Sequence, residues 1–299
     1  MKKRLTSLLL VLCMLATLIP LPAMAAAFDD TAEHWAKAGI EHLAEKNIVR
    51  GSQGKFRPDD TITRAEVAQI FDNLMDYQTA SDKFFTDLPD NAWYTEAVKK
   101  AVASSVFAGD GDGRITPLGK TTRQEFFVTL ARVLQLADSS KTPGFADAAD
   151  IATWAMPKLA ALTEAGLLTG VQNPNGTFSV NPLAPITRAE VAVMLDRAFP
   201  SIFSSADTYT QPVTGNAVVN KAGVKLDGVT VSGDLFIAPG VANGEVTLHS
   251  AKVAGRTMVY GGGKNSLLIN GESALQALIA AKQAGERPLA IKLFDKSTV

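Results

Sequence analysis

Three arginines, each inside the short pattern Thr-Arg-x-Glu, are the residues of this 299-residue chain that most clearly suggest chemistry. The pattern occupies residues 63–66, 122–125 and 187–190. A Thr three residues before a Glu forms a capping box, so each pattern predicts a helix that begins at its Arg. A helix N-terminus offers free N–H groups and partial positive charge, and Arg adds a planar fork that matches a carboxylate. We therefore expect Arg64, Arg123 and Arg188 to bind an anion, the alternative being a surface charge.

The helices that would position these arginines show one buried face each. Counted from each Arg, apolar residues fall at the third, seventh and tenth following positions, which is the period of a helix with an apolar stripe. These positions are Val67, Phe71 and Leu74; Phe126, Leu130 and Val133; Val191, Leu195 and Ala198. An earlier helix is predicted in the first segment from Ala36, Ile40 and Leu43.

The arginine pattern closes a longer unit that occurs three times. Each unit opens with Phe-x-Asp, continues to a Trp, and then has an apolar pair followed by Gly and a turn that contains Pro. The Asp residues are Asp30, Asp87 and Asp147, the Trp residues are Trp35, Trp93 and Trp154, and the Gly residues are Gly51, Gly109 and Gly170. A unit of about 55–65 residues buries little surface alone, so the three are expected to share one core.

The ordered set of motifs resembles the S-layer homology (SLH) domain family. The resemblance covers residues 28–200 and implies a mostly helical, pseudo-threefold bundle of helix–loop–helix repeats with grooves between neighbours. It also implies binding of secondary cell wall polysaccharide, often with pyruvylated sugars. A pyruvyl ketal carries one carboxylate, for which each repeated Arg would provide a seat.

The other repeated residues have two interpretations each. The tryptophans belong either to the core or to flat faces for sugar rings. The aspartates either stabilise a local turn or bind the ligand, and the glycines are left-handed helix ends whose bare backbone could line a groove. The Thr and Glu of each capping box are interpreted as structural. Asp110 and Asp112 suggest calcium, but the twelfth position of an EF-hand loop is not Glu from either start, which favours a turn.

The N-terminus has the pattern of an export signal. Basic residues 2–4 precede an apolar stretch and the small residues 23–25, so residues 1–26 are predicted to be a cleaved signal peptide rather than a membrane anchor. Cleavage removes the only Cys and changes the formal net charge from −1 to −4. A disulfide framework, a cysteine metal site and a basic nucleic-acid surface are thereby excluded. No cofactor, metal or nucleic acid is expected, and no membrane contact after cleavage.

The C-terminal part is predicted to be a different domain, a small β-solenoid. Segments beginning at Val213, Val231 and Val253 align with one another, and an interleaved series begins at Val224, Val246 and Leu267. Strands that recur about every 22 residues with glycine turns are typical of solenoid coils. The segment looks like the right-handed β-helices that follow some SLH modules. Glu272 to Lys282 is predicted to be a capping helix, and 288–294 a last strand.

The predicted domains are SLH units at 27–84, 85–143 and 144–200, a linker at 201–210, and the solenoid at 211–299. The sequence thus favours an exported, non-enzymatic surface protein, anchored to the cell wall or S-layer of a Gram-positive-type bacterium. One alternative is a structural solenoid that associates with itself or with other surface-layer proteins. The other is a glycan lyase or hydrolase, which is disfavoured because Asp227, Asp234 and His249 are isolated in the sequence and no catalytic motif occurs.

Overall fold

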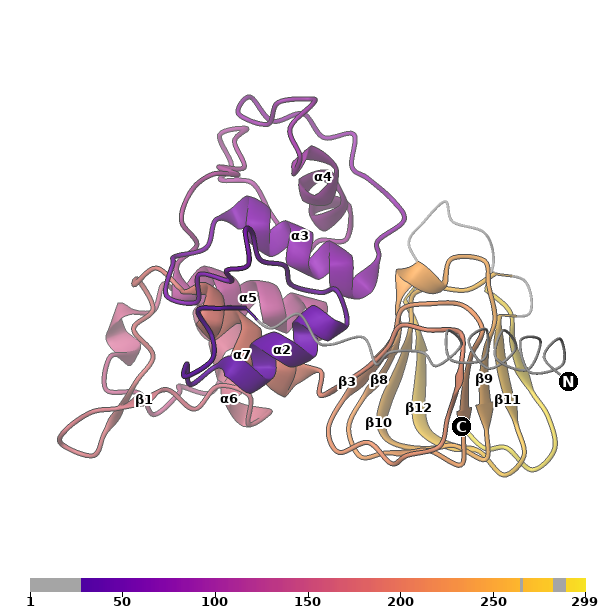
Figure 1. Cartoon of the computed structure of the whole chain (residues 1–299). Coiled ribbons are helices and arrows are strands. Elements are labelled where there is room, and N and C mark those ends of the chain that lie inside the picture. The colour runs from indigo at the N-terminus through magenta and orange to yellow at the C-terminus, as the bar shows by residue number, and fades with distance from the viewer. Residues whose placement is uncertain (1–27, 264–265, 282–288) are drawn as a thin grey trace, which may run out of the picture.

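The protein consists of a helical region followed by a β-solenoid of parallel strands (Figure 1). The computed structural model describes residues 28–263, 266–281 and 289–299. The predicted signal peptide lies outside the described residues. Within them, no helix is long and apolar enough to cross a membrane.

Six α-helices form the helical region, two from each repeat. The first helices of the repeats are α2 (Lys37–Glu45), α4 (Thr95–Ala103) and α6 (Met156–Glu164), and the second helices are α3 (Arg64–Met75), α5 (Arg123–Val133) and α7 (Arg188–Ala198). Each second helix begins at its repeated Arg behind a complete capping box. All nine stripe positions of these helices are buried, which confirms the predicted faces.

The repeats close into a ring by packing each second helix against the first helix of the next repeat. The pairs are α3 with α4, α5 with α6, and α7 with α2. Polar contacts support the pairs: His42 Nδ1 lies 2.6 Å from Asp196 Oδ1, and Lys100 Nζ donates to the carboxylate of Asp72 over 3.3 Å. The last repeat therefore completes the first, which explains why one unit alone would not bury its stripes.

Three backbone hydrogen bonds link the repeats in a cycle just before the second helices. The N–H of Ile62 donates to Ile186 O over 3.1 Å, that of Ile186 to Thr121 O over 2.9 Å, and that of Thr121 to Ile62 O over 3.0 Å. The side chains at these positions are buried, and Phe71 and Phe126 stack behind them with ring centroids 6.1 Å apart. The helical core is therefore shared by all three repeats.

The solenoid has two main parallel sheets, one on each side of its coils. The first contains β3 (Ser201–Phe203), β5 (Ala217–Val219), β8 (Leu235–Ile237), β10 (Lys252–Val259) and β12 (Ala274–Ala280), with β7 (Thr230–Val231) also on β10. The second contains β4 (Thr208–Tyr209), β6 (Val224–Asp227), β9 (Val246–His249), β11 (Leu267–Asn270) and β13 (Ile291–Leu293). Ala217 aligns with Leu235 and Thr257, and Val224 with Val246 and Leu267, as the sequence repeat predicts.

Two boundary predictions are wrong. The expected linker at 201–210 contains β3 and β4, which pair with β5 and β6 and so form the first coil. The expected capping helix at Glu272–Lys282 is strand β12 over its described part, paired with β10. Leu275 and Leu278 are three residues apart because the chain turns a solenoid corner there, opposite a bulge between Val253 and Arg256. The predicted last strand at 288–294 is confirmed by β13.

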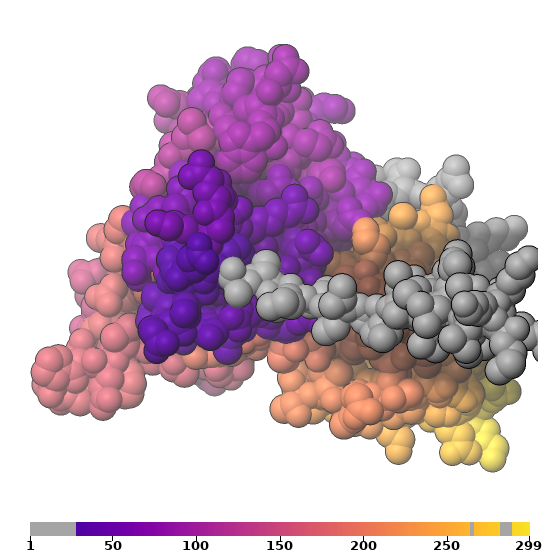
Figure 2. Space-filling view, in the orientation of Figure 1, coloured from indigo at the N-terminus to yellow at the C-terminus, as the bar shows by residue number. Residues whose placement is uncertain are grey.

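The helical region and the solenoid share one hydrophobic core. Val218, Phe236 and Met258 of successive coils pack with the buried residues of the helices, and the rings of Phe236 and Phe199 lie 5.4 Å apart. The space-filling view shows the two parts in direct contact (Figure 2). Because the chain enters the first coil three residues after α7, the solenoid is held against the ends of the central helices.

Candidate functional site

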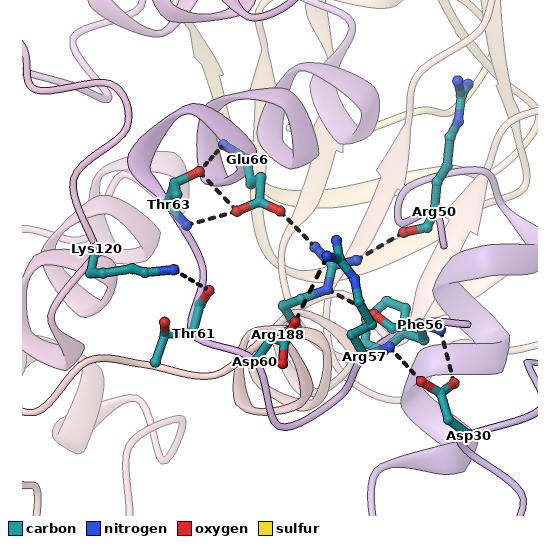
Figure 3. A network of polar contacts seen from close by, with 10 residues as sticks. All are labelled: Asp30, Arg50, Phe56, Arg57, Asp60, Thr61, Thr63, Glu66, Lys120 and Arg188. Atoms are coloured by element: carbon teal, nitrogen blue, oxygen red, sulfur yellow. Dashed lines mark hydrogen bonds and ion pairs between the residues drawn. The ribbon is translucent and has the colours of Figure 1, made fainter. Parts of the chain in front are cut away.

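The three repeated arginines join the repeats to one another in a cycle. Arg64 pairs with Glu125 over 3.5 Å, Arg123 pairs with Glu190, and Arg188 pairs with Glu66 over 3.1 Å. Each Glu caps its own helix with one carboxylate oxygen and forms an ion pair with the Arg of the preceding repeat through the other. Figure 3 shows this arrangement around Arg188, where Glu66 lies between Thr63 and the guanidinium.

Backbone carbonyls and aromatic rings complete the surroundings of these guanidinium groups. The Nε atoms of Arg64, Arg123 and Arg188 donate to Ile115 O, Val180 O and Phe56 O. Each guanidinium also lies 4.6–5.4 Å from the centroid of a phenylalanine ring. Arg123 and Arg188 are almost fully buried, whereas the Arg64 side chain retains 16% exposure. The alternative that these residues are plain surface charges is wrong.

The helix N-termini are not free anion seats, which corrects part of the sequence interpretation. The first two N–H groups of α3 donate to Gly119 O and Pro117 O over 3.0 and 2.8 Å, and the third donates to Thr63 Oγ1. The other two repeats make equivalent bonds. Neighbouring loops thus supply the oxygens that an anion would have supplied, and only guanidinium N–H groups remain for a ligand.

Burial lowers the pKa of Arg64 and of Arg188 below the usual arginine value, while the paired Glu125 and Glu66 oppose the change. Arg132 adds to the lowering at Arg64 because its own positive charge repels the guanidinium. Arginine remains charged in proteins, so the shift measures an unfavourable environment that an added negative charge would relieve.

The three opening aspartates stabilise turns. The carboxylate of Asp30 accepts from the N–H groups of Phe56 and Arg57, Asp87 accepts in the same way from residues 115 and 116, and Asp147 from residues 180 and 181. Burial raises the pKa of Asp30 and of Asp87, but these hydrogen bonds together bring it below the usual range. Of the two interpretations, the local turn role is the one the geometry supports.

The three glycines are needed for close packing more than for left-handed backbone. Only Gly170 has a positive φ, of 74°, so the helix-end interpretation is wrong for Gly51 and Gly109. A Cβ on Gly109 would lie 2.7 Å from the Phe85 ring and 2.8 Å from Arg114 O, and the other two positions are similarly crowded. The left-handed residues after the first helices are Asn47, Ser105 and Gly166.

The three tryptophans are exposed, so the core interpretation is wrong. Trp35, Trp93 and Trp154 retain 66%, 62% and 55% of their accessible surface. They are available as flat apolar faces.

Two cavities bring the repeated residues together, each from all three repeats. Groove 1–2 has a volume of 560 Å³, within the range of about 300–1,000 Å³ that is usual for ligand pockets. It is lined by Arg64 of the first repeat, Gly109 and Glu125 of the second and Trp154 of the third. Groove 2–3, of 190 Å³, is lined by Arg123, Gly170, Glu190 and Trp35. Arg188 makes the corresponding contacts with Glu66 and Arg50 O between the third and first repeats, and we call this place groove 3–1.

The S-layer homology domain model matches residues 27–68, 84–127 and 144–192, the three repeats that form these grooves. The chain contains three tandem S-layer homology domains. It is an SLH-domain cell-surface protein related to S-layer proteins.

Known proteins share the SLH region with this chain. The Surface-layer 125 kDa protein of Lysinibacillus sphaericus is 31% identical over 169 residues, which are 56% of this chain and 14% of that protein. Exoglucanase XynX of Acetivibrio thermocellus is 30% identical over 175 residues, 56% of this chain and 16% of the relative. S-layer protein sap of Bacillus anthracis is 28% identical over 179 residues, which are 58% of this chain and 21% of that protein. The matched segments are thus a small part of each relative.

The SLH grooves contain cations that sequence reasoning missed. Arg132 lines groove 1–2 and donates to Val106 O, and Arg197 lines groove 2–3 and donates to Leu167 O. Both stand nine residues after the repeated Arg, where the first SLH domain has Asn73, which donates to Ile48 O. Lys120 also lines groove 1–2. Alignment of the repeats beyond the Thr-Arg-x-Glu pattern would have found the first two.

On the solenoid, the acids and the histidine are not all isolated. Asp227, His249 and Asn270 are register partners on successive coils, with His249 Nδ1 2.8 Å from Asn270 Oδ1 and its Nε2 3.9 Å from Asp227. The Asp227 carboxylate accepts from Lys225 over 2.7 Å, and that hydrogen bond lowers its pKa. Asp234 pairs with Arg256. Among the described residues, no group of three or more His, Cys, Asp or Glu could hold a metal ion.

Proposed function

We propose that the SLH grooves hold an anionic, pyruvylated secondary cell wall polysaccharide and so anchor the exported protein non-covalently to a Gram-positive-type envelope. The observation that carries this proposal is the composition of grooves 1–2 and 2–3. A guanidinium with further N–H groups lies beside a backbone-lined wall at glycine and an exposed tryptophan. Arginine suits a carboxylate and an indole face suits an apolar sugar face.

The ligand's carboxylate would meet the arginine in competition with its glutamate partner. The guanidinium has five N–H donors, and Arg188 uses three of them, for Phe56 O, Glu66 and Arg50 O. Remaining donors point along the guanidinium plane, where a carboxylate could accept without breaking the bridge between SLH domains. The arginines thus serve both the fold and the ligand.

Because of this double role, tryptophan substitutions test the proposal better than arginine substitutions. Removing one partner of a buried ion pair costs about 3–5 kcal/mol, so a triple Arg→Ala protein is expected to lose stability together with binding. Trp35→Ala, Trp93→Ala and Trp154→Ala together remove only exposed side chains. Phe84→Ala, at a residue with 79% exposure outside the two cavities, is the matched control.

The experiment is co-sedimentation of the chain from residue 27 onward with purified cell walls, before and after chemical extraction of their secondary polysaccharide. We expect the wild type and Phe84→Ala to bind only unextracted walls, and the triple tryptophan variant to remain in the supernatant. Binding that survives extraction would overturn the proposal, because peptidoglycan or wall protein would then be the receptor.

One observation favours self-association of the solenoid as a second candidate function. The interior column Leu226, Leu248 and Ile269 is fully buried, but its continuation Leu293 on β13 is 47% exposed. In the described part of the chain, β12 and β13 are the last strands of the two sheets. Thr298 bridges to Ala274 at the start of β12, but the edge of β13 lies beside the exposed Leu293, and such an edge favours pairing with another chain. We propose this end as the contact if the protein oligomerises.

Sedimentation velocity of the same chain tests the second candidate. We expect a concentration-dependent increase in sedimentation coefficient that Leu293→Lys abolishes and Phe84→Lys leaves unchanged. A monomer at all concentrations would remove this candidate and leave the anchoring proposal untouched. We propose no catalytic step, since Asp227, Asp234 and His249 are engaged in contacts with other side chains.

A further inference from the structure

Groove 1–2 differs from groove 2–3 in size. Its 560 Å³ falls within the range of about 300–1,000 Å³ that is usual for small-ligand sites, whereas the 190 Å³ of groove 2–3 falls below it. Trp154 at the rim of groove 1–2 is also the least exposed of the three tryptophans, at 55%. Groove 1–2 therefore has room for more of a polymer than groove 2–3.

Groove 1–2 also has more cations without a carboxylate partner. Arg64, Lys120 and Arg132 line it, and of these only Arg64 forms an ion pair among the described residues, over 3.5 Å. Lys120 Nζ donates to Thr61 O and Arg132 donates to Val106 O, so both keep their charge unneutralised. The other acid in the wall, Asp110, directs Oδ1 to the N–H groups of residues 112 and 114.

Groove 2–3 has fewer such charges among the described residues. In groove 2–3, Arg123 is buried and tightly paired with Glu190, which leaves Arg197 as the cation without an ion pair in the described part of the chain. In the first SLH domain, Asn73 takes the place of Arg132 and Arg197. The position of Lys120, two residues before the capping Thr, is Thr61 in the first domain and Pro185 in the third.

The unpaired cations of groove 1–2 stand far apart. Lys120 precedes α5 and Arg132 lies near its end, and nine residues of helix from Arg123 to Arg132 already span about 14 Å. Lys120 Nζ and the Arg132 guanidinium are also directed to different carbonyls, Thr61 O and Val106 O, so one negative group is poorly placed to contact both. Two negative groups on different sugars of one chain can, and each would relieve the repulsion that the groove cations exert on one another.

We propose that groove 1–2 is the principal ligand site and that it binds an oligosaccharide segment carrying at least two negative groups, one near Arg64 and Arg132 and a second near Lys120. This inference rests on the proposed anchoring function and specifies the ligand of the same site. Groove 2–3 then accepts at most a single acidic sugar. The chain thus selects polymers by the spacing of their charges, through residues that its three SLH domains do not share.

The substitutions that test this inference are provided by the repeats themselves. Arg132→Asn introduces the residue that stands at position 73, where its amide donates to the equivalent carbonyl, so the structural bond is kept and the charge removed. Arg197→Asn is the matched change in groove 2–3. Lys120→Thr introduces the residue found at the equivalent position 61.

The experiment is calorimetric titration of the chain from residue 27 onward with two synthetic probes. One is a methyl hexosaminide with a single pyruvyl ketal, and the other is a trisaccharide with a pyruvyl ketal on each terminal sugar. Because a charged hydrogen bond contributes about 1.5–3 kcal/mol, we expect Lys120→Thr and Arg132→Asn each to weaken trisaccharide binding about tenfold or more. Arg197→Asn should change it less than about twofold, within the ordinary effect of a remote surface charge.

Three results distinguish the outcomes. Preference of the wild type for the trisaccharide, lost in the two groove 1–2 variants, supports the inference. Equal effects of Arg132→Asn and Arg197→Asn, or no effect of Lys120→Thr, overturn it while the anchoring proposal stands. Failure of the wild type to bind either probe, when it still binds unextracted walls, overturns the pyruvylated ligand and this inference with it.

Discussion

At the scale of single residues, the repeated positions carry more than one role each. Glu66, Glu125 and Glu190 were interpreted as helix caps, and they are, but each also bridges to the arginine of the preceding SLH domain. A carboxylate has two oxygens, so capping with one leaves the other for an ion pair. The arginines, for which a ligand contact was the expectation and a surface charge the alternative, are held in these bridges between SLH domains.

Thr121 departs from the threefold pattern of buried apolar residues before the second helices, and this departure lowers stability. Its counterparts Ile62 and Ile186 are apolar, whereas the buried Thr121 Oγ1 has no hydrogen-bond partner among the residues that the structure describes. An unsatisfied buried hydroxyl costs about 1–3 kcal/mol. Thr121→Val keeps the shape and is expected to raise the free energy of unfolding by about 1 kcal/mol, measured by urea denaturation. Thr129→Val is the control, because its hydroxyl donates to Glu125 O and its loss should destabilise.

Asp87 provides a prediction that depends on pH. Its folded pKa is lowered, so its contribution to stability is present above the unfolded value of about 3.9 and is lost as pH falls through the folded pKa. Asp87→Asn should lower the free energy of unfolding by about 1.5–3 kcal/mol at pH 7, because hydrogen bonds to a charged group are lost. The difference from wild type should shrink below about pH 4. Asp90→Asn, at an exposed carboxylate, should show no such difference at either pH.

At the scale of elements, close approach of the opening phenylalanine to a loop fixes each groove wall. Gly109→Ala would force a Cβ to within 2.7 Å of the Phe85 ring and 2.8 Å of Arg114 O. Overpacking of this kind costs about 1–3 kcal/mol, and we expect a corresponding loss in urea denaturation together with weaker wall binding. Gly144→Ala, where nothing lies within 4 Å, is the control. Equal stability of the two variants would show that the Phe85 contact is dispensable.

At the scale of the whole molecule, the solenoid supplies polar groups to the ends of all three central helices. Asn220 donates to Leu74 O at the end of α3, Arg256 to Leu134 O and Gln135 O after α5, and Asn216 to Ala198 O at the end of α7. These carbonyls have no partner within their own helices. An SLH fragment ending at residue 200 would expose them together with the shared core, so binding experiments need the longer chain.

This interface predicts cooperative unfolding of the helical region and the solenoid. All three tryptophans of the chain lie in the SLH domains, so their fluorescence reports on that region, while far-UV circular dichroism reports on both. We expect coincident urea transitions by the two probes. Arg256→Ala should shift both transitions equally and destabilise by about 1–3 kcal/mol, since it leaves Asp234 Oδ2 and two carbonyls without their guanidinium donor. Lys292→Ala on the exposed last strand should shift neither. Separate transitions would contradict the shared core.

The sequence by itself determined what depends on local pattern. Capping boxes fixed where α3, α5 and α7 begin, the apolar stripe fixed their buried faces, and the repeat alignment fixed the register of Ala217, Leu235 and Thr257, because coils stack equivalent residues. The SLH family followed from the order of these motifs.

Only the tertiary structure decided what depends on contacts between distant segments. Trp154 reaches a groove whose arginine belongs to the first SLH domain, and residues 201–210 form a coil because β5 and β6 lie beside them. The sequence pattern of β12 indicates a helix, and the segment is a strand because its backbone forms hydrogen bonds with β10. Burial and strand pairing depend on the assembled ring of SLH domains and the stacked coils of the solenoid. They therefore cannot be predicted from a residue's neighbours in the sequence.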